Sequence, residues 1–164
     1  MIHLKTNPKG IDAEMQGIQE YLYEKLNDWN LEAFGRAEII DKKPRVFYKK
    51  NDYKEVLFLN ETSNGKFFFV DSEKTKLEEG FLVTDVDLYF LLDVKKIKPN
   101  VNHRADEEIR VEILNYLQKK YKEIDITKGQ KVLSNFETKL NDMQPYHFLK
   151  FSFEVKYQSI LNKC

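Results

Sequence analysis

The stretch Thr84–Lys96, TDVDLYFLLDVKK, decides the fold because its apolar residues alternate with a period of two. The alternate positions Val86, Leu88, Phe90, Leu92 and Val94 are all apolar, which is the pattern of a β-strand with one face against a core. The other set contains aspartates and is apolar only in its middle, at Tyr89 and Leu91. The sequence therefore predicts a long strand that is buried on one face and covered on the other only in its centre.

One helix is expected before this strand in the sequence and another after it. After it, the Pro99–Asn100 turn is expected to stop the strand, and the spacing becomes helical from Ala105 to Tyr121, with acids in the first turn and bases in the last. Before it, the segment Ile11–Trp29 has a period near that of an α-helix. We expect Asp12 to be the N-cap of the first helix and His103 to cap the second.

Shorter strands and loops complete the prediction. The sequence Asn64-Gly65 is a strong hairpin signal, so we expect an antiparallel meander before the long strand. Tyr146–Tyr157 alternates cleanly and predicts a half-buried strand near the end of the chain. The highly charged segment Asp71–Gly80 is expected to be an exposed loop. The meander strands are predicted at Ala37–Ile40, Pro44–Lys49, Glu55–Leu59 and Lys66–Val70, while Lys131–Phe136 is compatible with a strand or a turn of helix.

These elements predict one α+β domain. The chain has 164 residues, the length of a single domain, and it contains no internal repeat or linker. We expect a mainly antiparallel twisted sheet with two principal helices packed on one face. Residues 1–10 and 158–164 are expected to be flexible ends of the domain 1–164.

Composition argues against several classes of function. The 27 basic and 27 acidic side chains cancel, so no global charge favours a nucleic acid or an anionic membrane as partner. Basic residues do surround Phe47 and Tyr48, but nearby acids offset them, and we interpret this face as a solvated hairpin. The single cysteine, Cys164, allows no disulfide within one chain. Neither a signal peptide nor a membrane-spanning run is evident, so synthesis in a reducing cytoplasm is expected.

The sequence contains one weak catalytic pattern. Asp93-Val94-Lys95 has the D-x-K form of a metal-dependent nuclease, in which acids hold Mg²⁺ and a lysine assists the attack of water. Alternatively, Asp85, Asp87, Asp93 and Lys95 solvate an exposed strand face and discourage edge-to-edge pairing. We favour the second interpretation and expect no enzyme activity.

The three histidines give no metal site either. None of His3, His103 and His147 has metal-ligand spacing with another histidine, a cysteine or clustered carboxylates. His147 alternates with core residues of the last strand and is expected to be a partly buried histidine with its polar atoms satisfied. We therefore expect no cofactor and no bound metal.

The order of elements resembles that of tail terminator (tail-completion) proteins of long-tailed bacteriophages. Two strings carry the resemblance: VDLYFLLDVKKIKPNVNHRADEEIRVEILNYL (Val86–Leu117) and DMQPYHFLKFSFEVKY (Asp142–Tyr157). In that family, helices pack on one face of a sheet, and a hexameric ring caps the tail tube, stops its polymerisation and joins it to the head-side connector. The resemblance implies a structural virion protein assembled in the cytoplasm of a bacterial host. Its partners would be other copies of itself, the tail tube protein and the connector protein, with no membrane.

Position in the predicted fold suggests which residues would serve such a ring. Asp85, Asp87 and Asp93 are expected to face the lumen, where acids would repel phosphates and let DNA pass without specific binding. Candidates for contacts between subunits lie on the charged loop and the meander: Tyr48, Tyr53, Asp71, Glu73, Lys74, Lys76 and Phe81. Three alternatives remain: another head–tail connector or head-completion ring protein, a nuclease using Asp93 and Lys95, and a small monomeric adaptor.

Overall fold

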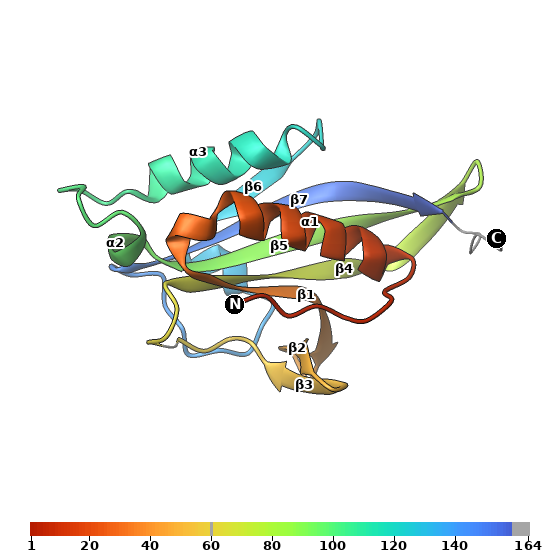
Figure 1. The fold of residues 1–164 in the computed structure, drawn as a ribbon, viewed down its shortest axis with the longest axis horizontal. Helices are drawn as coiled ribbons and strands as arrows, with labels where there is room; N and C mark the ends of the chain where they lie inside the picture. Colours follow the sequence, from red (N-terminus) through yellow and green to blue (C-terminus); the bar gives the residue numbers. More distant parts are fainter. Residues whose placement is uncertain (60, 159–164) are drawn as a thin grey trace.

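The computed structural model describes residues 1–59 and 61–158, and this part of the chain contains a seven-stranded sheet and three α-helices (Figure 1). The strand order is β3–β2–β1–β4–β5–β7–β6, with β1 parallel to β4 and the other neighbours antiparallel. This mostly antiparallel arrangement is consistent with the predicted α+β class. The strands are β1 (Leu31–Ile40), β2 (Lys43–Lys49), β3 (Asp52–Glu55), β4 (Gly65–Glu78), β5 (Phe81–Asp93), β6 (Asp125–Lys128) and β7 (Tyr146–Gln158). The helices are α1 (Ile11–Lys25), α2 (Val94–Ile97) and α3 (Asp106–Leu117), with 3₁₀ turns η1 (Asn27–Trp29) and η2 (Gln130–Leu133).

The central strand β5 confirms the prediction made from its alternation. Its apolar set is buried, as are Tyr89 and Leu91 on the opposite face, whereas Asp85 is exposed. The strand ends at Asp93 rather than at the Pro99–Asn100 turn. The reason is local: the Asp93 carboxylate accepts a hydrogen bond of 3.0 Å from the backbone N–H of Lys96 and thereby caps the single turn α2.

Two apolar cores lie against the sheet. The first contains the buried residues of α1 and α3 together with the apolar set of β5 and the facing residues of β7. The second is built around Phe34, Phe68, Tyr89 and Phe148, and it includes residues of the connecting segments 56–57 and 132–146. These cores account for the aromatic content of the strands, because both faces of the central strands bury side chains.

Several predicted strand boundaries are wrong. β1 begins at Leu31 instead of Ala37. Its start was missed because its first four residues are all buried and show no alternation of apolar and polar side chains. β3 covers Asp52–Glu55 instead of Glu55–Leu59, and Val56 and Leu57 leave the sheet to enter the second core. β6 was not predicted, and the segment Lys131–Phe136 begins within η2.

The prediction of a loop at Asp71–Gly80 is wrong, since most of this segment belongs to a long hairpin formed by β4 and β5. β4 continues to Glu78, pairs with β5 as far as the Glu78–Phe81 pair, and projects at one end of the molecule (Figure 1). Glu79 and Gly80 have φ angles of 50° and 83°, the two consecutive positive values of a type I′ turn. β7 pairs with β5 as far as the Phe81–Gln158 pair, so β4 is the edge strand of this projection. Its residues from Glu73 to Glu78 are all exposed and therefore carry no hydrophobic period.

The prediction of a hairpin turn at Asn64-Gly65 is also wrong, and Gly65 has a different role. It begins β4 between Leu31 of β1 and Leu92 of β5. A Cβ atom at this position would lie 2.6 Å from the backbone oxygen of Leu91. The glycine is therefore required by a close approach of two backbones rather than by a turn.

The substitution Gly65→Ala is expected to lower the free energy of unfolding by about 1–3 kcal/mol, the usual cost of overpacking a rigid site. Urea unfolding at neutral pH measures this loss. Gly17→Ala is the matched control, because a Cβ built there in the middle of α1 meets no atom within 4 Å apart from its chain neighbours and the nearby backbone of its own helix. Equal stability of the Gly65→Ala variant and the native protein would contradict the close-approach argument.

The N-terminal residues, expected to form a flexible end, run along β1. Ile2 forms a parallel bridge with Ala33, and the backbone N–H of His3 donates to the Ala33 oxygen at 3.0 Å. The N-cap of α1 is Gly10, so the prediction of Asp12 is wrong. The Asp12 carboxylate instead accepts from Arg36 Nε at 2.7 Å and ties α1 to β1. Of the expected C-terminal end 158–164, residues 159–164 lie outside the described part of the chain.

Candidate functional site

Most of the predicted contact residues lie on the projecting hairpin, which consists of the part of β4 from Asp71 onward, the turn, and the start of β5. Glu73, Lys74 and Lys76 are exposed on it, and Phe81 is 44% exposed. Asp71 lies at its base, half-buried and 3.7 Å from Arg36 Nη1. Sequence reasoning missed the nearby Leu77, which at 68% is among the most exposed apolar residues of the described chain. Exposed apolar side chains beside charged ones are the usual composition of a contact surface.

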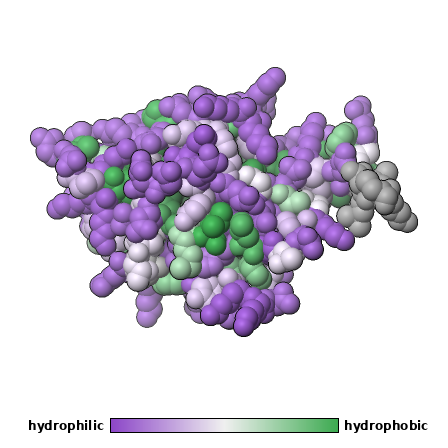
Figure 2. All heavy atoms as spheres, in the orientation of Figure 1, coloured by the Kyte–Doolittle hydropathy of each residue, from purple (hydrophilic) through white to green (hydrophobic). Residues whose placement is uncertain are grey.

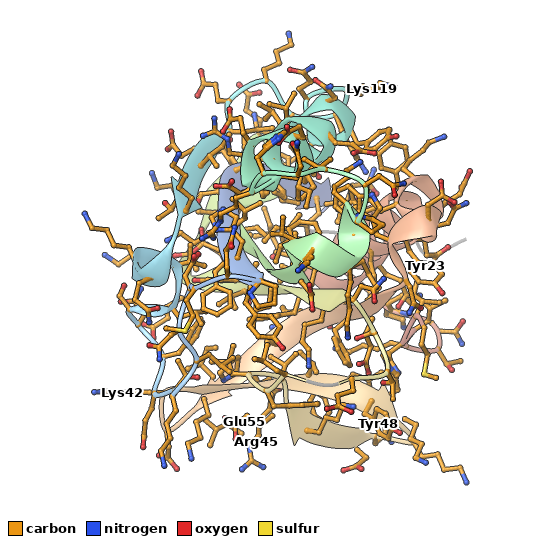
Figure 3. The ribbon with its side chains drawn as sticks, turned by 90° about the vertical axis from the view of Figure 1, so that its left-hand side faces the viewer. Tyr23, Lys42, Arg45, Tyr48, Glu55 and Lys119 are labelled. Carbon is orange, nitrogen blue, oxygen red and sulfur yellow. The ribbon has the colours of Figure 1, made fainter. Side chains whose placement is uncertain are left out.

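Tyr48 and Tyr53 belong to a separate surface, formed by β2 and β3. Both are half-buried: Lys54 Nζ lies 4.1 Å from the ring centroid of Tyr48, and Tyr53 packs edge-on against Phe47 at 6.1 Å. Tyr48 lies on the opposite side of the molecule from α3, as do Arg45 and Glu55, which face each other across the strands (Figure 3). The predicted contact residues therefore form two surfaces and not one.

Hydrophobic atoms gather on one face of the molecule between α1 and the β2–β3 hairpin, while most of that face is hydrophilic (Figure 2). Exposed apolar side chains are also recorded outside the projecting hairpin, at Met1, Leu4, Ile39, Ile40, Phe58, Leu59, Val111 and Met143. Apolar patches of this kind mark contacts with other molecules more often than isolated exposed residues do.

The structure does not bring the three predicted lumen acids into one group. Asp85 is exposed, Asp87 accepts a hydrogen bond of 2.6 Å from Ser152 Oγ, and Asp93 is buried as the cap of α2. Asp85 and Asp93 share a face of β5 but lie about 26 Å apart at the usual rise of a strand. No group of three or more His, Cys, Asp or Glu within residues 1–59 and 61–158 is placed to hold a metal ion.

A cleft of about 560 Å³ lies beside α2. Figure 1 shows that α2 lies toward the end of the molecule opposite the projecting hairpin. Its walls come from α2, the segment leading to α3, and the segment before β7. The lining combines basic with apolar side chains and contains no acid among the described residues. The lining residues are Val94, Lys95, Lys98, Val101, Asn102, His103, Arg104, Gln144 and Pro145.

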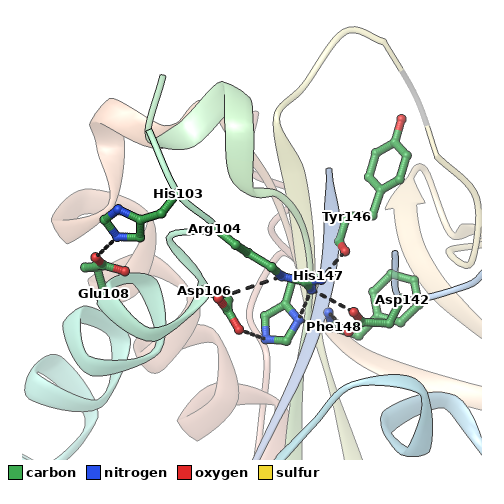
Figure 4. Close-up of polar contacts among 8 residues, drawn as sticks. All are labelled: His103, Arg104, Asp106, Glu108, Asp142, Tyr146, His147 and Phe148. Carbon is green, nitrogen blue, oxygen red and sulfur yellow. Dashed lines mark hydrogen bonds and ion pairs between the residues drawn. The ribbon is translucent and has the colours of Figure 1, made fainter. Parts of the chain in front are cut away.

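A buried polar network holds one wall of this cleft in place (Figure 4). Arg104 Nη2 donates to Asp142 Oδ1 at 2.8 Å and to the Tyr146 backbone oxygen at 3.3 Å. Asp142 Oδ2 accepts from the backbone N–H of Phe148 at 3.0 Å and lies 2.9 Å from His147 Nδ1. The side chains of Asp142 and His147 are 7% and 4% exposed. The network therefore fixes the start of β7 to the segment before α3.

Histidine predictions fare differently in this region. His147 is buried within the network, as its place among core residues predicted. The expectation that its polar atoms are satisfied is wrong, because Nε2 has no hydrogen-bond partner among the described residues. Burial lowers the pKa of His147, and the nearby Asp142 carboxylate offsets that effect only in part. His103 does not cap α3, whose N-cap is Ala105; it contacts the Glu108 carboxylate at 2.6 Å instead. Arg104 and Asp142 were missed, although an inward histidine signals that some polar partner must reach it.

A second buried charged cluster lies between the N-terminal segment, β1, β3 and β4. Glu32 Oε1 lies 3.0 Å from His3 Nε2 and 3.4 Å from Lys54 Nζ. Lys66 is 2% exposed, and its Nζ lies 3.5 Å from the ring centroid of Phe58 with no hydrogen-bond acceptor in the described residues. Burial lowers the pKa of Lys66 to about 8, although Glu32 acts in the opposite direction. No feature of the strand-like sequence around Lys66 indicated this burial.

Comparison with protein-family models, with curated proteins and with solved structures gives no match. Among the helices of residues 1–59 and 61–158, none is long and apolar enough to cross a membrane. The functional argument therefore depends on the surfaces described above.

Proposed function

We propose that this protein is a structural subunit of a phage neck, a tail terminator that forms a ring on the end of a tail tube. The observation that carries the proposal is the projecting hairpin, which lies at one end of the molecule (Figure 1) and exposes Leu77 and Phe81 beside its turn. A ring needs such a surface, because each copy must present one patch to its neighbour and receive another. The α+β fold with a mostly antiparallel sheet supports the proposal, and we include in it that α1 and α3 cover the same sheet face.

The proposed role is mechanical and involves no turnover. A hexameric ring in the virion would stop the tail tube protein from polymerising, and its other side would join the head–tail connector protein. DNA would pass through the lumen without specific binding, and the exposed carboxylate of Asp85 is suited to line such a passage. Another connector or head-completion ring would use the same surfaces but would bind the head side instead of the tube.

The proposal is tested by adding the purified protein to tail tubes that lack a terminator. Electron microscopy is expected to show a ring on one end of each tube and an arrest of further growth. Failure to bind tube ends, at concentrations where the protein self-associates, would contradict the terminator role. Binding to the head-side connector alone would favour the other ring protein.

The double substitution Leu77→Ser with Phe81→Ser is expected to remove tube capping while the fold is retained, because both side chains are already exposed. Val111→Ser is the matched control, since Val111 is 43% exposed on α3 and lies outside the hairpin. Capping by the hairpin variant at the native level would show that this surface makes no contact of consequence. Circular dichroism verifies that both variants remain folded.

A further inference from the structure

We propose that the hairpin tip of one copy docks into the cleft beside α2 of the next copy. The inference deepens the proposed function, on which it rests, by assigning both halves of the contact between neighbouring subunits. The acceptor is the cleft lined by residues of α2, 101–104 and 144–145. The donor is the tip Leu77–Phe81, which comprises the turn and the last pairs of β4 and β5.

The two surfaces are complementary in charge. The tip carries the acids Glu78 and Glu79, whereas the cleft presents Lys95, Lys98 and Arg104 with no acid in its lining. Lys98 and Arg104 already pair with carboxylates of their own chain, but Lys95 is exposed and forms no ion pair within the described residues. A carboxylate from outside therefore has at least one cation available for a charge-assisted hydrogen bond.

The two surfaces are also complementary in apolar character. Leu77 pairs with Leu82, and Glu78 pairs with Phe81, so successive pairs place an apolar side chain on each face of the tip. The cleft offers apolar walls at Val94, Val101 and Pro145, and its volume of about 560 Å³ is sufficient for a few side chains. Burial of Phe81 in such a pocket would supply the aromatic anchor that stable contacts usually contain.

The position of the two surfaces determines the type of assembly. The hairpin tip and the α2 end lie at opposite ends of the longest axis of the molecule (Figure 1). A contact between opposite ends is heterologous, and it generates a ring when the rotation between neighbours closes. Identical copies joined in this way use every tip and every cleft, so no surface of either kind remains unpaired.

A charge-reversal experiment tests the inference. The tip variant combines Glu78→Lys with Glu79→Lys, and the cleft variant combines Lys95→Glu with Lys96→Glu, the second lysine lying in the hollow that adjoins the cleft. Each variant alone is expected to self-associate at least tenfold more weakly than the native protein, measured by light scattering. An equal mixture of the two, and a chain carrying all four substitutions, are expected to recover association because opposite charges meet again.

Other outcomes overturn the inference. Native-like association of either variant alone would place the contact elsewhere, as would a mixture that fails to recover. A native protein that stays monomeric at about 1 mM would also exclude the contact, while binding to tube ends in the same preparation decides the proposed function separately. Loss of tube binding by the cleft variant with normal self-association would assign the cleft to an acidic segment of the tube protein.

Discussion

Lys66→Met is expected to raise the free energy of unfolding by about 3 kcal/mol at pH 7. The fall of the Lys66 pKa from its ordinary 10.5 to about 8 measures how strongly the folded protein disfavours the ammonium form. At about 1.4 kcal/mol per pKa unit, this fall corresponds to about 3 kcal/mol. Methionine has a similar length and no charge, and its sulfur can contact the Phe58 ring that now faces the ammonium group at 3.5 Å.

The gain is expected to depend on pH in a defined direction. Below the folded pKa of about 8, both the folded and the unfolded chain bind the proton, so the full cost of the buried charge is present. Between about 8 and 10.5 the folded protein loses the proton first, and the native protein becomes more stable relative to the variant. Burial also raises the pKa values of Tyr89 and Tyr121, but these groups are common to both proteins and cancel in the difference.

Urea unfolding of both proteins across pH 7–11 measures the difference. Lys54→Met is the matched control, because the Lys54 side chain is 31% exposed and pairs with Glu32, so its loss is expected to cost up to about 1 kcal/mol. A Lys66→Met variant that is less stable than the native protein at pH 7 would contradict the argument. So would a gain that remains constant across this range.

The elements that sequence reasoning predicted are those with a face that is at least partly exposed to water. α1, α3, β5 and β7 each place apolar residues at a regular spacing, because water covers at least part of their other side. The first half of β1 lacks this period, since Leu31 to Phe34 are buried on both sides. Its parallel pairing with β4 depends on residues far apart in the chain, which no local pattern encodes.

The functional surfaces were predicted less well for a related reason. The charged segment after Asp71 was correctly expected to be exposed, but the end of β4 is an exposed edge strand with no hydrophobic period that separates it from a loop. The cleft joins α2, the segment before α3 and the segment before β7, and these meet only in the folded chain. Arg104 and Asp142 are likewise brought together across 38 positions of sequence.

Asp142→Ala is expected to lower the free energy of unfolding by about 1–3 kcal/mol, the effect of leaving buried hydrogen-bond donors without their acceptor. The Asp142 side chain is 7% exposed, accepts hydrogen bonds from Arg104 Nη2 and from the backbone N–H of Phe148, and lies 2.9 Å from His147 Nδ1. Its removal would leave the Arg104 guanidinium without its closest anion and the Phe148 N–H without an acceptor. The segment before β7 would then lose its attachment to the start of α3.

Urea unfolding at neutral pH measures this loss, and two further substitutions identify its source. Asp142→Asn keeps an acceptor for the Phe148 N–H but removes the charge, so an intermediate loss is expected. Glu108→Ala removes the exposed partner of His103 in the same region and is expected to leave the stability nearly unchanged, because water screens an exposed ion pair. A loss for Asp142→Ala as small as that for Glu108→Ala would show that the network does not hold the two segments together. Asp142→Ala is also expected to weaken self-association, because Arg104, Gln144 and Pro145 line the cleft. At temperatures where the variant remains folded, this weakening is expected to exceed what its loss of stability alone would cause.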